Sequence, residues 1–383
     1  MEPDWAHLLP ELVSIISKKI SIIKEYVNLQ AVCKPWRETL TPRPLHLPHQ
    51  VPWLMLPRGS PDDFRKNGID DSYITFYDLS RSTIHRFELP FLSGKYICGS
   101  SHGWLILEHD YRLSLLNPIT RTSIKLPSFS DVSTNLVIGY KRKRSDSFDE
   151  KRRYKRCIRK VILSSNPSEP GCVVVARFKS LGSLLYYCRI CDSSWTKLRA
   201  DVGQNPVLSP LWDFIFQNNL VFTMNFKGEV TIYDLENLSV KTFPSRLMLN
   251  NACYNLVQGV GEFGGPLVVK HSVDSEKTNF SVYKWVNNGE PKWCQVKNIG
   301  KQVLFINLFK SLPVLSSANL QLENWQGNQI CYHAWRPMTS EYFQVNITCV
   351  NLESRKDVEN IHSPTDEFPR KSGATLWLTP SLI

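Results

Sequence analysis

The chain of 383 residues lacks any long apolar run. Its best candidate for a membrane span, Val303 to Leu322, is interrupted by Lys310 and Pro313, whereas a span needs about 20 predominantly apolar residues. The first residues also lack the basic and apolar stretches of a secretory signal, because Glu2 and Asp4 lie there instead. We therefore expect an intracellular protein, nuclear or cytoplasmic or both, with no membrane segment.

The sequence also lacks a complete zinc-binding pattern, although it contains ten cysteines. Cys188 and Cys191 form a single C-x-x-C pair, and Cys331 and His333 could share one face of a strand. Structural zinc needs four ligands, and no second pair has the usual spacing. Inside the cell we expect reduced thiols. We predict no metal and no cofactor.

Two segments match the sequences of catalytic or nucleotide-binding motifs but lack the helix that those motifs require. The segment Gly99 to Gly103 fits G-x-S-x-G with Ser101 as the nucleophile, but that motif needs a helix behind the serine. Trp104 to Leu107, which follows, is typical of a strand. Gly259 to Gly264 fits G-x-G-x-x-G and is likewise followed by a strand pattern. We interpret both as turns between strands and predict that the protein is not an enzyme. The alternative is a hydrolase-like enzyme whose active site lies in the strand-rich domain that makes up most of the chain.

Positive charge is concentrated in one segment of the sequence. The net charge is +11, and 141–156 contributes +6 of it through nine basic and three acidic residues. Such runs indicate a nuclear import signal or a nucleic-acid patch, and an exposed loop suits either. Few aromatic residues interleave with the run, which disfavours nucleic-acid binding. The nuclear-import candidates are Lys141, Arg142, Lys143, Arg144, Lys151, Arg152 and Arg153.

The first forty residues predict three short helices. Pro10 suits the first position of a helix, and apolar residues then recur at helical spacing at Leu12, Ile15, Ile16 and Ile20. A second helix is expected from about Lys24 to Cys33, and Pro35 starts a third that contains Trp36. A module this small rarely sustains a core alone, so we expect it to need a partner.

The same residues resemble the F-box. The resemblance rests on Leu9-Pro10-Glu11-Leu12, Ile15-Ile16 and Val32-Cys33-Lys34-Pro35-Trp36-Arg37. It implies docking on the Skp-type adaptor of a cullin ubiquitin ligase. The alternative is an ordinary helical cap on the next domain with Trp36 as its core residue. The adaptor-binding residues implied by the resemblance are Leu9, Pro10, Leu12, Ile15, Ile16, Val32 and Trp36.

Six prolines between Pro42 and Pro61 predict an extended linker that holds the helical module away from the rest of the chain. Within this segment, Trp53 to Leu56 is apolar enough to form the first strand of the next domain. We place the boundary near residue 46, with an F-box domain at 1–45 and a second domain at 46–383.

A strand-turn-strand pattern repeats through the second domain. Each copy is a strand that ends in Asp or Asn, followed by a strand that proline stops. Spacings of 39, 43 and 50 residues between copies fit propeller blades. We predict a mainly β chain, a small α module followed by a β-propeller of six or seven blades, with a pair of β-sandwiches as the alternative. Copies start at Tyr77, Leu116 and Tyr233, and weaker ones at Cys191, Tyr283 and Val350.

Further segments resemble the KIB-type propeller that follows the F-box in a large plant family. They are Cys98 to Leu105, followed by Leu115 to Thr120 and Leu126-Pro127, and the terminal Leu376 to Leu382. The resemblance departs at the basic insert and at Gly300 to Glu323, which leaves the blade count open. Together the two resemblances imply the substrate-recognition subunit of an SCF-type ubiquitin ligase, with the adaptor on the F-box and an unidentified target protein on the propeller.

Overall fold

The computed structural model describes residues 5–20, 23–41, 44, 51–56, 70–129, 158–178, 184–198, 211–244, 247, 253–259, 264–274, 277–287, 289–307, 315–317, 327–337, 342–355, 357–362, 368–369 and 376–381. Helices come first: the short η1 (Trp5–His7), then α1 (Pro10–Lys19), α2 (Ile23–Ala31) and α3 (Lys34–Thr39). Strands follow, with one further short helix, η2 (Pro90–Leu92). No helix among these residues is long and apolar enough to cross a membrane.

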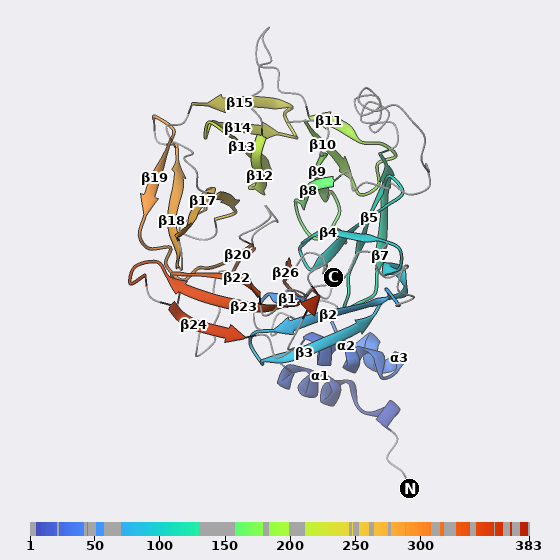
Figure 1. Ribbon diagram of the computed structural model, residues 1–383. Coiled ribbons are helices and arrows are strands. Elements are labelled where there is room, and N and C mark those ends of the chain that lie inside the picture. The colour runs from blue at the N-terminus through green and yellow to red at the C-terminus, as the bar shows by residue number, and fades with distance from the viewer. Residues whose placement is uncertain are drawn as a thin grey trace, which may run out of the picture.

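The strands form six sheets arranged as a ring (Figure 1), so the protein is a six-bladed β-propeller. Blade 1 consists of β26 (Leu376–Leu378), β1 (Trp53–Met55), β2 (Tyr73–Asp78) and β3 (Thr83–Glu88). Blade 2 consists of β4 (Tyr96–Ser101), β5 (Trp104–His109), β6 (Arg112–Leu116) and β7 (Ser123–Ser128). Blade 3 consists of β8 (Ile158–Leu163), β9 (Val173–Phe178), β10 (Leu185–Arg189) and β11 (Thr196–Leu198).

The second half of the ring continues the same order. Blade 4 consists of β12 (Leu211–Gln217), β13 (Leu220–Asn225), β14 (Val230–Asp234) and β15 (Ser239–Phe243). Blade 5 consists of β16 (Cys253–Val257), β17 (Leu267–Asp274), β18 (Lys277–Val286) and β19 (Lys292–Val296). Blade 6 contains β20 (Val303–Asn307), β21 (Leu315–Ser317), β22 (Gln329–Pro337), β23 (Tyr342–Asn351), β24 (Asp357–His362) and β25 (Phe368–Pro369).

The predicted mainly β architecture is confirmed, and the blade count is six. Blade 6, which includes the weakly repetitive Gly300 to Glu323, departs from the regular meander because β20 pairs parallel with β22 and antiparallel with β21. The inner strands β26, β4, β8, β12, β16 and β20 line the ring's centre (Figure 1). Contacts between neighbouring inner strands include β4 with β8 and β12 with β16.

Each interface between neighbouring blades contains its own buried apolar cluster. Between blades 3 and 4, for example, Val175 packs in one cluster with Phe214, and between blades 4 and 5 Met224 packs with Leu256. The same holds for the other four interfaces. Because apolar burial drives folding, the blades stabilise one another around the whole ring.

The turn chemistry predicted for the repeat is confirmed in four copies. The side chains of Asp78, Asn117, Asp234 and Asn351 each accept hydrogen bonds from backbone N–H groups two or three residues ahead, at 2.9–3.1 Å. The fourth residue after each has positive φ, from 52° to 62°. Asp192 differs, since it accepts from the backbone N–H of Arg189 behind it. A local Asx turn therefore builds the same hairpin between the two outer strands of four blades.

The chain ends close the ring. β26 pairs antiparallel with β1, so that Trp377 lies opposite Leu54 and the C-terminal strand becomes the inner strand of blade 1. The indole Nε1 of Trp377 donates to the carbonyl oxygen of Ile306 in blade 6 at 3.1 Å. On the other side, Asn117 Nδ2 donates to the carbonyl oxygen of Ser381 at 2.9 Å. Closure thereby joins blades 6, 1 and 2.

The helical module lies against the rim of the ring next to blade 1 (Figure 1). Ile23 and Val27 of α2 pack on the apolar cluster between blades 1 and 2, which includes Leu89 and Leu92. The expectation that the prolines hold the module away from the propeller is therefore wrong. Proline spacing sets the path of the backbone, but apolar burial decides where a helix comes to rest.

Gly103 offers a direct test of ring closure. It has φ +82°, and a Cβ atom there would lie 2.3 Å from Ser381 Cβ and 2.8 Å from the carbonyl oxygen of Thr379. We expect Gly103→Ala to lower the free energy of unfolding by about 1–2 kcal/mol for the left-handed backbone and by about 1–3 kcal/mol more for the clash. Urea unfolding curves measure the change.

Gly94→Ala is the matched control, because Gly94 has φ +71° with nothing within 4 Å of the added Cβ. It should show only the backbone effect. Equal destabilisation by the two substitutions would contradict the tight contact between the β4–β5 turn and the C-terminal segment.

Candidate functional site: an apolar surface on the helical module

The three helices of the module enclose a small core. Val13, Tyr26, Trp36 and Leu40 are buried in it. The indole Nε1 of Trp36 donates to the carbonyl oxygen of Trp5 at 3.0 Å. The Tyr26 hydroxyl donates to the carbonyl oxygen of Thr41 at 2.9 Å, and burial raises the pKa of this phenol, which stays protonated at neutral pH. These bonds fix the helices relative to one another.

Trp36 does not lie where the F-box resemblance places an adaptor contact. Its side chain is only 7% exposed, inside the module core. The resemblance to the F-box grouped Trp36 with the adaptor-binding residues, whereas the alternative of a helical cap made it a core residue. Its burial agrees with the second assignment for this residue. Trp36 therefore belongs to the core that holds the three helices together.

The remaining residues of that predicted set are exposed. Leu9 precedes α1 and is 63% exposed, Pro10 occupies the first position of α1 and is also exposed, and Val32 between α2 and α3 is 56% exposed. Large exposed apolar side chains of the module, which we call the apolar surface, are Trp5, Leu9, Leu12, Ile15, Ile16 and Val32.

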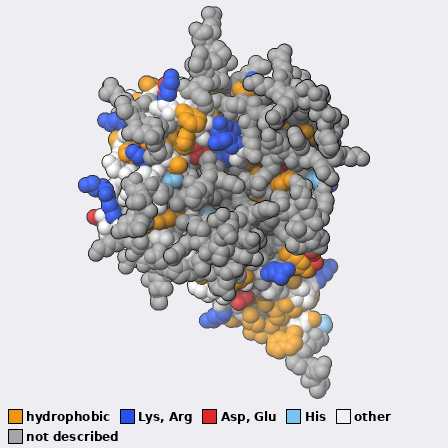
Figure 2. Space-filling model, viewed as in Figure 1, with side chains coloured by type: hydrophobic (Ala, Val, Ile, Leu, Met, Phe, Trp, Pro, Cys, Tyr) orange, Lys and Arg blue, Asp and Glu red, His pale blue; other side chains and the backbone are white. Residues whose placement is uncertain are grey.

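The apolar surface arises because α1 is apolar around more than half of its circumference. Val13 and Ser17 face the module core, whereas Leu12, Ile15 and Ile16 lie on the adjacent side and face solvent. Figure 2 shows hydrophobic side chains gathered on this module. Contiguous exposed apolar patches are rare on monomeric proteins and mark interaction sites. The surface is therefore a candidate docking site for an apolar groove.

The G-x-S-x-G segment is a turn, as predicted. It joins β4 to β5 through His102 and Gly103, which have φ +50° and +82°, and no helix follows. The Ser101 hydroxyl accepts a hydrogen bond from the backbone N–H of Leu163 in blade 3 at 3.3 Å. His102 Nε2 is 3.3 Å from the carbonyl oxygen of the same residue. Both side chains join blades 2 and 3.

The second glycine motif also precedes a strand. Gly259 exchanges two hydrogen bonds with the amide side chain of Gln217, each at 3.1 Å, and β17 begins at Leu267. The motif's residues 260–263 lie outside the described part of the chain.

The cysteines fall into different environments. Cys188 is buried, which raises the pKa of its thiol to about 12, whereas Cys191 is exposed. Cys331 lies directly opposite Cys349 on the neighbouring strand, and a disulfide joins them. The expectation of reduced thiols throughout is wrong for this pair. Among the described residues no three His, Cys, Asp or Glu side chains are grouped as metal ligands.

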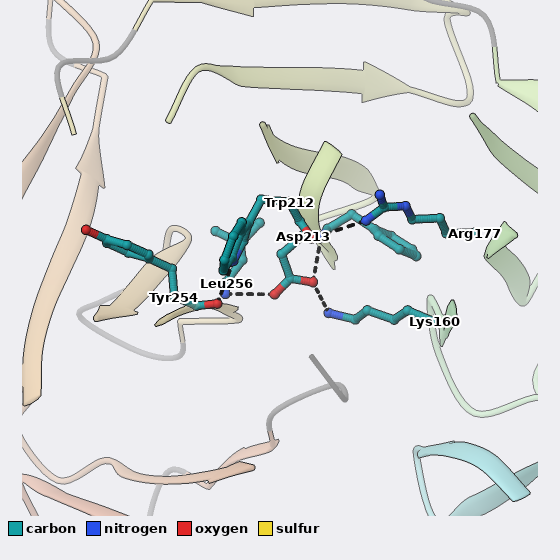
Figure 3. Close-up of polar contacts among 7 residues, drawn as sticks. Lys160, Arg177, Trp212, Asp213, Tyr254 and Leu256 are labelled. Atoms are coloured by element: carbon teal, nitrogen blue, oxygen red, sulfur yellow. Dashed lines mark hydrogen bonds and ion pairs between the residues drawn. The ribbon is translucent and has the colours of Figure 1, made fainter. Parts of the chain in front are cut away.

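A buried ion pair joins blades 3, 4 and 5 (Figure 3). Lys160 Nζ of β8 lies 2.6 Å from Asp213 Oδ1 of β12, with each side chain at most 2% exposed. Asp213 Oδ2 accepts from the backbone N–H of Leu256 in β16 at 2.9 Å. Sequence reasoning missed this pair, although a lysine and an aspartate within two largely apolar strands are a visible signal.

Arg177 extends the network. Its Nη1 donates to the carbonyl oxygen of Trp212 at 3.2 Å. Burial and the neighbouring positive charge of Arg159 lower the pKa of Arg177 to about 10, and Asp213 opposes that shift. The guanidinium therefore remains charged at neutral pH. Because Lys160 and Asp213 neutralise each other, the network has a net positive charge.

The basic run that the sequence assigns to an exposed loop lies outside the described residues. This holds for every nuclear-import candidate, namely Lys141, Arg142, Lys143, Arg144, Lys151, Arg152 and Arg153.

Comparisons with known proteins place the propeller in a family. Residues 76–357 match the family model described as the KIB1-4 beta-propeller. The chain is 21% identical to "F-box protein At2g26160" of Arabidopsis thaliana over 82% of this chain and 92% of that protein. It is 32% identical to "F-box protein At3g56470" of the same plant over 31% of this chain and 29% of that protein. The recognition of a plant F-box protein with a KIB-type propeller is confirmed.

Among solved structures, the β-propeller domain of Cps50 (Swd1) from Myceliophteria thermophila is 10% identical, with a TM-score of 0.36 over 78% of this chain and 83% of that domain. 

The ion pair between Lys160 and Asp213 can be tested by removing one partner and then both charges. Asp213→Ala leaves a buried lysine uncompensated, so we expect the free energy of unfolding to fall by about 3–5 kcal/mol. Asp213→Asn combined with Lys160→Met removes both charges and keeps an acceptor for the N–H of Leu256. This double variant should recover at least half of the loss in denaturant unfolding. A double variant as unstable as Asp213→Ala would show that the two charges are not coupled.

Proposed function

The chain belongs to the KIB1-4 β-propeller family, and we propose that it is the substrate-recognition subunit of an SCF-type E3 ubiquitin ligase. In this proposal the helical module binds a Skp-type adaptor, and through it a cullin, while the propeller binds the target protein. The similarity to Arabidopsis proteins named F-box proteins supports the assignment.

The observation that carries the proposal is the apolar surface of the module. Val13 and Trp36 already fill the module core, so the exposed Leu12, Ile15 and Val32 are not needed to hold the helices together. Burying a leucine-sized side chain contributes about 1.5–3 kcal/mol. A partner that covers the surface would therefore gain substantial affinity from a few residues.

The position of the module suits a receptor. Because Ile23 and Val27 anchor α2 on the propeller, an adaptor bound to the apolar surface would have a fixed orientation relative to a target bound on the ring. Ubiquitin transfer would then be performed by other subunits, and this chain would not be an enzyme. We also retain as proposals the division into 1–45 and 46–383 and a nuclear or cytoplasmic location.

Adaptor binding tests the proposal. Leu12→Asp with Ile15→Asp places two charges on exposed positions of α1, so we expect loss of adaptor binding in a pull-down with an unchanged melting temperature. Lys241→Asp in β15 of blade 4 is the matched control. Lys241 is exposed and lies outside blades 1 and 2, on which the module packs, and the substitution changes the net charge by the same amount as the double variant. It should bind as the wild type does.

Leu9→Ala with Pro10→Ala should likewise reduce adaptor binding, because it removes an exposed apolar contact and the helix start. If the variant with Leu12→Asp and Ile15→Asp still binds the adaptor at the wild-type level, the proposed binding surface is refuted. Trp36→Ala is unsuitable as evidence, since loss of a core tryptophan costs about 3–5 kcal/mol and would unfold the module.

The basic run generates a separate prediction about location. Replacing Lys141 to Arg144 and Lys151 to Arg153 by Gln should lower nuclear accumulation of a fluorescent fusion without changing the melting temperature, because an exposed loop contributes little to stability. Unchanged nuclear accumulation would remove the run from the import machinery.

A further inference from the structure

Basic and aromatic side chains meet at one end of blades 3 to 5, where the inner strands begin. The second residues of β8, β12 and β16 are Arg159, Trp212 and Tyr254, so they occupy equivalent places in three successive blades. Phe226 directly follows β13, the strand paired with β12. Figure 2 shows basic and hydrophobic side chains beside one another near the centre of the ring.

The aromatic side chains form one contiguous group. The ring of Trp212 lies edge-on to that of Phe226, with 4.7 Å between centroids, and 6.2 Å from that of Tyr254. Trp212 Nε1 donates to the carbonyl oxygen of Tyr254 at 2.7 Å, which fixes the indole. Tyr254 is buried, whereas Phe226 is 47% exposed. A large aromatic ring is therefore presented to solvent on a rigid base.

Positive charge surrounds this group. Arg177 donates a hydrogen bond to the carbonyl oxygen of Trp212. Burial and the nearby, exposed Arg159 both lower the pKa of Arg177. Lys227, which follows Phe226 in the chain, is also exposed. The strands β8, β9, β12, β13 and β16 and the turn 226–229 contain two acids. Asp213 pairs with Lys160, and Glu229 accepts from Asn225 Nδ2 at 2.5 Å.

We infer that this basic-aromatic patch, formed by the exposed Arg159, Phe226 and Lys227 with the half-buried Trp212 and the buried Arg177 beneath them, docks an acidic peptide segment that carries an aromatic or other apolar side chain. Charge complementarity carries the inference, because an incoming carboxylate would offset the mutual repulsion of Arg159 and Arg177. An apolar side chain would cover Phe226. The inference rests on the proposed function in one respect, that the propeller holds the target.

A peptide suits the patch better than a nucleic acid does. Nucleic-acid binding derives most of its affinity from several phosphate contacts along a basic track. Among the residues of this patch only Arg159 and Lys227 are exposed cations, which is fewer than a track of phosphate contacts requires.

Fluorescence anisotropy with the full chain tests the inference. The probe is a labelled peptide of alternating glutamate and aspartate with one phenylalanine, and the comparison peptide has glutamine and asparagine in place of the acids. We expect Arg159→Glu with Lys227→Glu to weaken binding of the acidic peptide about tenfold, because it replaces attraction by repulsion at two exposed sites. Phe226→Ala should weaken it by a smaller factor. Binding should also weaken as salt is added.

Arg189→Glu with Lys241→Glu is the matched control, because it reverses two exposed cations on the outer part of the same blades. An equal loss of affinity in this control would overturn the inference, since only net charge would matter. Equal affinity for the uncharged peptide, or no detectable binding of the acidic one, would also overturn it. Tighter binding of an oligothymidine that the patch variant weakens would reassign the patch to nucleic acid.

The adaptor pull-down on the same variants separates this inference from the proposed function. Retained adaptor binding together with weakened peptide binding supports the patch. Retained adaptor binding with unchanged peptide binding refutes the patch alone and leaves the receptor proposal standing.

Discussion

The pairing of β26 with β1 is the constraint on which the rest of the propeller depends. Each of these strands spans three residues, so its ladder of hydrogen bonds is short. Contacts around the pair compensate: Trp377 reaches blade 6, and Asn117 of blade 2 holds Ser381. A ring closed in this way keeps the edges of its sheets short and protected. The apolar clusters between all six blades can form together only after β26 has paired with β1.

Sequence reasoning succeeds in this protein where the determining interaction is local. An Asp or Asn at a strand end bonds the backbone a few residues ahead, so the side chain alone specifies the turn. It fails where the partner is distant in the chain. Lys160 and Asp213 are separated by 53 positions. Ile23 of the helical module packs in the cluster that contains Leu89 and Leu92 of the propeller, which are also distant in the sequence. Register likewise brings Cys331 opposite Cys349, which no spacing rule states.

The helical module shows the same limit for the candidate site. Apolar periodicity marks Leu12, Ile15 and Ile16 on α1, but it does not mark Val13, which the structure buries in the module core. The division between core and surface follows from packing: once Tyr26 and Trp36 fill the space between the helices, Leu12 and Ile15 have no place inside and remain exposed. An apolar surface is thus a consequence of a core that is already full. That is a physical reason to look for its partner outside the chain.

The buried ion pair between Lys160 and Asp213 also affects the basic-aromatic patch. A buried pair is weak evidence for stability, because its desolvation offsets most of its attraction. In β12, however, Trp212 directly precedes Asp213, at the register shift between Leu211 and Asp213. Anchoring Asp213 to Lys160 and to the N–H of Leu256 therefore also sets the position of Trp212, whose ring supports the exposed Phe226. The same pairing neutralises the one carboxylate of β12, so that Arg159, Arg177 and Lys227 supply positive charge beside that aromatic group. Interior electrostatics thus determine both the shape and the sign of the surface above them.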